Sequence, residues 1–252
     1  METSKISKTN KIAEITILFW VMKIVATTLG ETLGDFISMT LDLGYLTGVG
    51  ITIVFFVFFL YYQLKTIKYE PFAFWFLIIA TTTLGTEISD FIDRSLHLGY
   101  TICYIFLLSS LLFTLYFWFS KYKNLNVNPI LENNKEMYFW IAVLFSNSLG
   151  TAFGDYLSDV IGFSYIQGAL ITASIILFVV ILHYCTKLNE AFLFWLAFVF
   201  TRPFGATFGD FLTKPTTKGG IDLGTLQASL VSIILMLILV YYSRKKTKLI
   251  SN

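Results

Sequence analysis

Residues 19–36 read FWVMKIVATTLGETLGDF, and the same pattern returns three times along the chain. The later copies are FWFLIIATTTLGTEISDF at 74–91, FWIAVLFSNSLGTAFGDY at 139–156 and FWLAFVFTRPFGATFGDF at 194–211. In every copy a Gly stands ten residues and an Asp fifteen residues after the Trp, with Gly or Ser before the Asp and Phe or Tyr after it. Four occurrences of so long a pattern identify a tandem repeat.

The composition places these repeats in a bilayer. Of the 252 residues, 56% are hydrophobic and only 13% are charged, whereas a soluble domain carries roughly 25% charged residues. The apolar runs are about 20 residues long, which is the length that a membrane-spanning helix needs. The first run follows Lys5, Lys8 and Lys11 and lacks a small-residue cleavage signal, so we expect it to be a retained membrane helix.

A short polar turn and a second apolar run follow each Asp, so we predict two helices in each repeat. The fold class is therefore an all-α polytopic membrane protein with eight transmembrane helices, arranged as four two-helix repeats in one membrane domain over 1–252. We place the repeats at about 12–66, 67–121, 132–187 and 188–243, in two halves, 1–121 and 132–252. The predicted spans are about 14–38, 45–64, 72–93, 100–120, 137–158, 165–186, 191–212 and 223–243.

The basic residues predict the orientation. The N-terminus, the three linkers between repeats and the tail carry 13 Lys and Arg, whereas the turns within repeats carry three, Arg94, Lys214 and Lys218. Because cytoplasmic loops are enriched in Lys and Arg, both termini are expected in the cytoplasm. All four repeats then point the same way and are related by a pseudo-symmetry axis along the membrane normal.

With these features the chain resembles a family of bacterial membrane proteins of unknown function. That family is defined by four tandem repeats, each with two transmembrane regions and a tryptophan. The Phe-Trp pairs and the Gly-Asp elements, such as Gly34-Asp35 and Gly154-Asp155, carry the resemblance over nearly the whole chain. The resemblance implies the plasma (inner) membrane of a bacterium as the location, and it implies no activity.

A polar stripe follows the first helix of every repeat. Positions 7, 11, 15 and 19 after the Trp lie on one helix face, and 14 of the 16 residues there are polar. A charge at the centre of a bilayer costs at least about 3 kcal/mol, so the stripes must face other helices or water. We therefore expect the first helices inside, around the axis, and the apolar second helices outside. The stripes are Thr27, Glu31, Asp35, Met39; Thr82, Thr86, Asp90, Arg94; Asn147, Thr151, Asp155, Asp159; and Arg202, Ala206, Asp210, Lys214.

The four stripe aspartates are expected to form a ring at one depth, with Glu31 and Glu87 adding acidity nearby. A structural alternative is that each Asp only bonds a turn or a neighbouring helix. The Gly-x3-Gly or Gly-x3-Ser spacing before each Asp is typical of close helix packing, which we expect as at least part of its role. The ring consists of Asp35, Asp90, Asp155 and Asp210.

Two bases fall inside the predicted spans. Arg202 stands where the other repeats have Thr or Asn147, and an Arg at this depth needs a carboxylate partner, with Glu31 or Asp155 as candidates. The pair is either purely structural or a fixed counter-charge that competes with a transported cation. Lys23 lies one turn above its Trp and is expected to reach the cytoplasmic interface.

The leading functional hypothesis is a transporter or channel for a small cation. Six acids against two bases within the spans favour cations, and carboxylates suit hard divalent ions such as Mg²⁺, Ca²⁺ or Mn²⁺, or protons. The ion-path candidates are Asp35, Asp90, Asp155, Asp210, Glu31, Glu87, Arg202 and Asn147, and the four aspartates are the candidate metal ligands.

The alternative is a non-transporting membrane sensor or an assembly partner. An enzyme is not expected, because residues 32–35 read Thr-Leu-Gly-Asp rather than the Gly-x-Gly-Asp of intramembrane aspartyl proteases, and other catalytic signatures are missing. We expect no cofactor and no nucleic-acid partner. Cys103 and Cys185 sit in apolar runs, where packing is their usual role. The expected partners are the bilayer and a small cation, with a homo-oligomer open.

Overall fold

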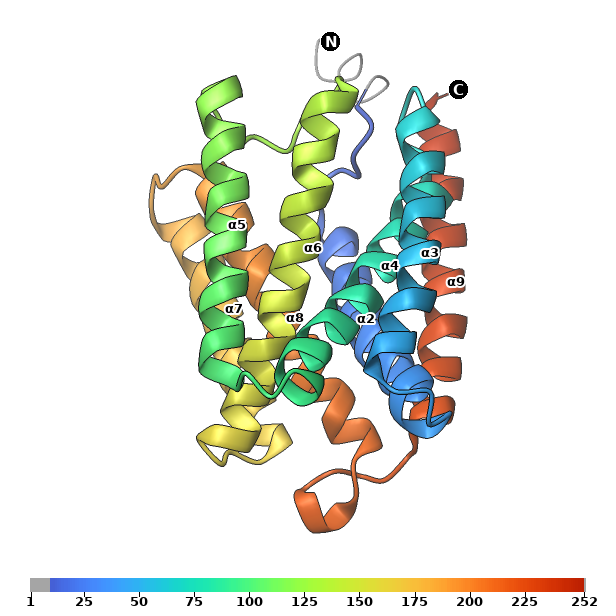
Figure 1. The fold of residues 1–252 in the computed structure, drawn as a ribbon. Coiled ribbons are helices and arrows are strands. Elements are labelled where there is room, and N and C mark those ends of the chain that lie inside the picture. Colours follow the sequence, from blue (N-terminus) through green and yellow to red (C-terminus); the bar gives the residue numbers. More distant parts are fainter. Residues whose placement is uncertain (1–9, 252) are drawn as a thin grey trace.

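The computed structural model describes residues 10–251, without the side chains of residues 246–251, so Lys5, Lys8 and the last tail lysines lie outside what it describes. All eight predicted spans fall on long helices in this part of the chain, and both of its ends lie at the same end of the bundle (Figure 1). The helices are α2 (Ile17–Asp35), α3 (Tyr45–Lys65), α4 (Pro71–Asp90), α5 (Tyr100–Tyr122), α6 (Asn133–Asp155), α7 (Tyr165–Cys185), α8 (Glu190–Thr213) and α9 (Thr225–Ser251).

Several helix starts follow from local sequence. The Thr16 hydroxyl accepts a hydrogen bond from the backbone N–H of Phe19 at the start of α2. Ser164 and Gln167 form a reciprocal capping box at the start of α7, and the Asn189 side chain caps α8. Each cap satisfies backbone donors that the first turn of a helix leaves without an intrahelical partner.

The first helices of the four repeats form a closed inner ring. Helix α2 packs against α4 and α8, and α6 packs against the same two helices from the other side. Each second helix covers the inner helix of the following repeat: α3 packs on α4, α5 on α6 and α7 on α8. Helix α9 then packs on α2, so the last repeat closes on the first (Figure 1). The predicted arrangement of inner and outer helices is confirmed.

One contact is repeated around the ring and explains why the spacing of the small residues recurs in every repeat. A Cβ on Gly30 would lie 2.3 Å from the Thr82 hydroxyl oxygen, and one on Gly205 would lie 2.3 Å from the Thr27 hydroxyl oxygen. Since a real Cβ does not approach so closely, only glycine allows adjacent inner helices to come this near. In the other two interfaces Gly85 meets Asn147 and Ser148, and Gly150 meets Arg202 and Pro203.

Burial separates the helices that face lipid from those that do not. The outer helices expose large apolar side chains such as Phe58 and Leu170, as expected for a surface in contact with lipid. Seven of the helices in the described residues are long and apolar enough to cross a membrane. The eighth, α6, has 23 residues, or about 34 Å of rise. It begins with the polar residues Asn133, Asn134, Lys135 and Glu136, and α4, α5 and α8 enclose it.

Aromatic side chains fill the ring toward the end that carries the chain termini. The Phe19 ring lies 6.4 Å from the Phe74 ring and 6.2 Å from the Phe194 ring, and Phe74 lies 5.4 Å from Trp140. All four residues are at most 6% exposed. The Phe of each Phe-Trp pair therefore belongs to a packed layer that closes this end of the axis.

Candidate functional site

The four predicted aspartates lie at the opposite end of the inner ring. Asp35, Asp90 and Asp155 are the last α-helical residues of α2, α4 and α6, and each is followed by a π-helical turn. Asp210 lies one turn before the end of α8. The four side chains are only 2% to 5% exposed. They face neither lipid nor bulk water, and the three at helix ends make no capping bond to the turn that follows.

The expected single ring of aspartates is divided into two bridged pairs. The Lys214 Nζ lies 2.6 Å from Asp35 Oδ2 and 3.3 Å from Asp210 Oδ1. The Arg94 guanidinium lies 3.7 Å from an Asp90 oxygen and 3.6 Å from an Asp155 oxygen.

The division has a simple origin in the stripe. Arg94 and Lys214 occupy its last position, four residues after the Asp of repeats two and four, where repeats one and three have Met39 and Asp159. A base four residues after an acid on a helix lies beside it. The same base reaches the Asp of the next repeat around the ring. The four-fold pattern of the fold thereby becomes a two-fold pattern of charges.

Deeper in the axis, Arg202 and Glu31 form a fully buried ion pair. The Arg202 Nη2 lies 2.9 Å from Glu31 Oε2 and also donates to the Thr86 hydroxyl, while Nη1 donates to the Thr27 carbonyl at 3.3 Å. Arg202 is 0% and Glu31 3% exposed. The predicted pairing of Arg202 with a carboxylate is thus confirmed, with Glu31 as the partner. Asp155, the other candidate, lies beside Arg94 instead.

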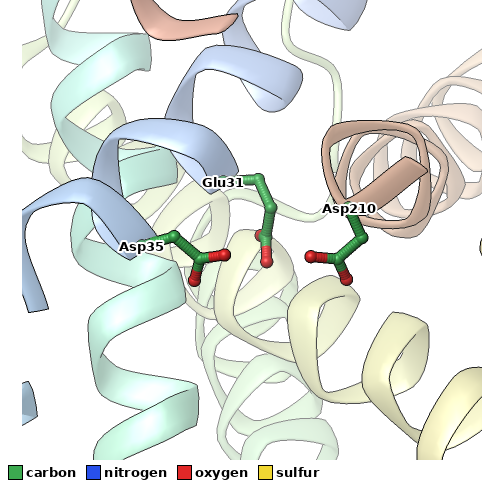
Figure 2. A group of neighbouring side chains, drawn as sticks. All are labelled: Glu31, Asp35 and Asp210. Atoms are coloured by element: carbon green, nitrogen blue, oxygen red, sulfur yellow. The ribbon is translucent and has the colours of Figure 1, made fainter. Parts of the chain in front are cut away.

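Glu31, Asp35 and Asp210 converge on one point between α2 and α8. Figure 2 shows the three carboxylates turned toward one another, and one oxygen from each lies within 4.8 Å of the others. Opposite oxygen ligands of Ca²⁺ lie about 4.6–5.2 Å apart and those of Mg²⁺ about 4.0–4.2 Å apart, twice the metal–oxygen distances. The three oxygens are no farther apart than 4.8 Å, so one hard divalent cation such as Mg²⁺ or Ca²⁺ can contact all of them.

The ammonium group of Lys214 stands where such a cation would bind. Burial by itself lowers the pKa of Lys214, but the Asp210 and Asp35 carboxylates more than offset burial and raise this pKa above its ordinary value. Lys214 therefore stays protonated at neutral pH. Its side chain is 21% exposed, so it lies at the mouth of the axis.

Glu87 was expected in the same ion path, but it lies apart from the three-acid cluster. It is 0% exposed, and neither carboxyl oxygen has a hydrogen-bond partner. The Ser38 hydroxyl lies nearby but donates its hydrogen bond to the Gly34 carbonyl at 2.9 Å. The carboxyl group lies against α3, where a Cβ on Gly48 would be 2.2 Å from Oε2.

Asn147 and Lys23 form a polar layer between the Arg202 pair and the aromatic layer. The Lys23 Nζ donates to Asn147 Oδ1 at 2.8 Å and lies 4.0 Å from the centre of the Phe198 ring. The Asn147 amide in turn donates to the Thr81 hydroxyl at 3.1 Å. Lys23 is 0% exposed, so the expectation that it reaches the interface is wrong. Phe19, four residues before Lys23 on the same face of α2, is 2% exposed, so this face of α2 points into the ring.

The charges of this region do not balance. Five carboxylates share three basic partners: Glu31 has Arg202, while Lys214 and Arg94 each serve two aspartates. The sixth, Glu87, has no basic partner among the described residues. Asp90 Oδ1 and Asp210 Oδ1 form no hydrogen bond and meet a base only through the ion pairs to Arg94 at 3.7 Å and to Lys214 at 3.3 Å. The site therefore has acceptor capacity and negative charge to spare for a cation or for protons.

Sequence reasoning missed the roles of three basic residues here. Arg94 and Lys214 were seen in the stripe but were treated as basic residues of the turns. Their spacing of four from Asp90 and Asp210 was the available signal. For Lys23 no sequence signal separates a buried amine from one that reaches the membrane surface.

The fold and this site define a class: a polytopic membrane protein of four parallel two-helix repeats around an acidic axis. The chain belongs to the family described as a Repeat of Unknown Function (DUF347), whose model matches it four times, at residues 18–69, 73–123, 138–189 and 193–247. No curated protein and no solved structure matches the chain.

Proposed function

We propose that the protein moves a small cation, either a hard divalent metal ion or protons, through the acidic axis of the inner ring. The observation that carries the proposal is the excess of carboxylates over bases at one end of this ring. Burying uncompensated charge is costly, and a structural network would be expected to balance its acids with bases. A partly compensated acidic cluster is instead suited to a cation that enters and leaves.

In this proposal Lys214 acts as a tethered competitor of the substrate. A cation that binds between Glu31, Asp35 and Asp210 displaces the ammonium group, which is free to swing outward because it is partly exposed. Arg202 holds Glu31 from the other side and supplies the next competing charge. The affinity for the substrate cation is then limited by competition with Lys214 and Arg202. Because these bases can take the place of the cation again, the cation is released as well as bound.

The test is flux into proteoliposomes that contain purified protein and a pH dye, with a panel of monovalent and divalent cations outside. We expect uptake of one ion, lost in Asp35→Asn and in Asp155→Asn. Asp42→Asn is the matched control, because Asp42 is an exposed acid in a turn outside the axis. Normal flux in both axis variants would refute the proposal.

A second candidate is a non-transporting sensor or assembly partner, favoured by the aromatic layer that closes the axis at the end with the chain termini. In that case the cation binds without crossing. Well-folded protein that binds a cation but gives no flux for any ion, and that purifies with another membrane protein, would favour this candidate.

The finer assignments are part of the same proposal. We place the protein in the plasma (inner) membrane of a bacterium with both termini in the cytoplasm, so the acidic mouth faces outward. We propose no enzymatic activity and no nucleic-acid partner. A homo-oligomer is compatible with the proposal, since one chain supplies a whole axis.

A further inference from the structure

A groove of about 430 Å³ lies between α3 and α9, over the seam where the inner helices α2 and α4 meet. Its floor includes Leu29, Ala80 and Met236, which are 1%, 6% and 2% exposed. Its rim includes Phe55 and Leu237, which are 55% and 45% exposed. The groove therefore opens on the outer, apolar surface of the bundle and reaches the inner ring.

The repeat explains why the groove occurs at this seam. Ala80 is the fifth residue after the Trp, and the equivalent residues of repeats three and four are Phe145 and Phe200. In the seam between α6 and α8, Phe200 meets Phe153 with a ring distance of 6.2 Å.

The two remaining seams also carry Phe at equivalent positions. By their positions in the repeat, Phe145 of α6 corresponds to Ala80, and Phe204 and Phe208 of α8 correspond to Leu29 and Leu33. At the seam between α2 and α4 the positions equivalent to these are Leu29, Leu33 and Ala80. The groove thus lies at the one seam where none of these positions carries a Phe.

The groove offers nothing polar to a ligand. Its two hydroxyl groups bond within their own helices: Thr52 donates to the Gly48 carbonyl at 2.8 Å, and Thr83 donates to the Ile79 carbonyl at 3.0 Å. An apolar cavity of about 150 Å³ already excludes water and takes up hydrocarbon. A groove roughly three times as large, lined in the same way, is suited to a hydrocarbon chain and not to water.

We propose that this groove binds one hydrocarbon chain of a bilayer lipid. All four surrounding helices are membrane-spanning, and the groove is continuous with the surface that faces lipid, so lipid chains are the apolar molecules that reach it. The lining runs from Leu29 of α2 to Ile37 of the π-helical turn that follows it, which is about 12 Å along the helix axis. On α4 the lining runs from Phe76 to Thr83, in the half nearer the chain termini. The hydrocarbon chain therefore lies parallel to the helices, across the middle of the bilayer.

Shape is the basis of binding in this setting. Lipid tails are as apolar as leucine, so a chain gains no hydrophobic free energy by moving from the bilayer into the groove. It gains close contacts with ordered walls on several sides, and these are individually weak but numerous. A bound chain is expected to exchange more slowly than the surrounding lipid, and its binding does not depend on the proposed cation transport.

The test is photo-crosslinking in liposomes with a phospholipid that carries a diazirine in one acyl chain. We expect peptides that contain Ala80 and Met236 to be labelled more than the exposed face of α7. Ala80→Phe restores the residue of repeats three and four, and it should lower labelling of the groove at least fivefold. Leu177→Phe is the matched control, because Leu177 is a 60% exposed residue of α7, and groove labelling should not change.

Thr83→Leu is a second, smaller filling variant, and it serves if Ala80→Phe fails to fold. It should lower groove labelling by about half. The proposal is overturned if groove peptides are labelled no more than the face of α7, or if folded filling variants leave the labelling unchanged. Crosslinks from the groove to a second copy of the chain would also overturn it.

Discussion

Replacing Lys214 with methionine is the most informative perturbation of the acidic cluster. Methionine keeps the length of the side chain and removes its charge. The change deletes the ion pairs to Asp35 at 2.6 Å and to Asp210 at 3.3 Å together. Both carboxylates are then buried next to Glu31 without a base of their own.

The expected loss of stability follows from how deeply Lys214 is buried. Removing one partner of a fully buried ion pair costs about 3–5 kcal/mol. Lys214 is 21% exposed, so we take a lower figure, about 2–3 kcal/mol, for the variant in the absence of a bound cation. In the parent protein a cation must displace the Lys214 ammonium group and lose these ion pairs, whereas in Lys214→Met it no longer has to. At 1.4 kcal/mol for each factor of ten, cation affinity should rise about 30- to 150-fold.

The assay is thermal unfolding of purified protein in detergent, in chelator and across a titration of Ca²⁺ and Mn²⁺. In chelator Lys214→Met should unfold at a lower temperature than the parent protein. A cation at about 100 times its Kd should return roughly 2.7 kcal/mol, enough to recover most of the loss. Lys218→Met is the matched control, an exposed lysine of the same turn, and it should behave like the parent.

Two results would refute this reasoning. One is a Lys214→Met protein that is less stable but is not stabilised by any divalent cation or by lower pH, which would make the cluster a structural network. The other is a cation response of equal size in the parent protein, Lys214→Met and Lys218→Met, which would place the binding elsewhere.

Three further outcomes follow from buried contacts. Lys23→Met removes an amine that is 0% exposed and has no ion-pair partner among the residues that the structure describes. Thermal unfolding should therefore show unchanged stability or a gain of about 1 kcal/mol, and a loss above that size would contradict this. Arg202→Met should lower the free energy of unfolding by about 3–5 kcal/mol because it leaves Glu31 charged and unpaired. Adding Glu31→Gln should recover at least half of this loss. A double variant that is no more stable than Arg202→Met would exclude the ion pair as the cause. Gly205→Leu should destabilise the protein by more than about 2 kcal/mol, because a Cβ has no room there. Gly50→Leu is the control: a Cβ at Gly50 has no neighbouring atom within 4 Å, so this variant should fold normally.

The sequence predicted the architecture closely because the fold depends on features that are local and repeated. Span length, the Gly-x3-Gly spacing and the polar stripe recur four times, so an error in one copy is corrected by the other three. It was harder to predict which outer helix packs on which inner helix. That α3 covers α4 rather than α2 depends on the tilt and handedness of the whole ring, which no single repeat encodes.

The candidate site was predictable only in part. Depth and charge limited the partner of Arg202 to Glu31 or Asp155, and the structure has Glu31. The division of the aspartates depends on which side chain a base reaches across a helix interface. The fate of Lys23 depends on a rotation of α2 about its own axis. A stripe defined by steps of four does not specify that rotation, because the side of α2 that carries Phe19 and Met22 is buried as well.

The differences between repeats indicate where function resides. A strictly four-fold protein would bury four identical aspartates around one axis, and their mutual repulsion would have no counter-charge. Bases at the last stripe position in repeats two and four lower that charge without cancelling it, and Arg202 places a third base in one repeat alone. Ala80 breaks the same symmetry on the lipid side. The shared residues therefore build the ring, and the departures from the repeat create the two features in this protein that are suited to binding: an acidic cluster with spare charge and an apolar groove with spare volume.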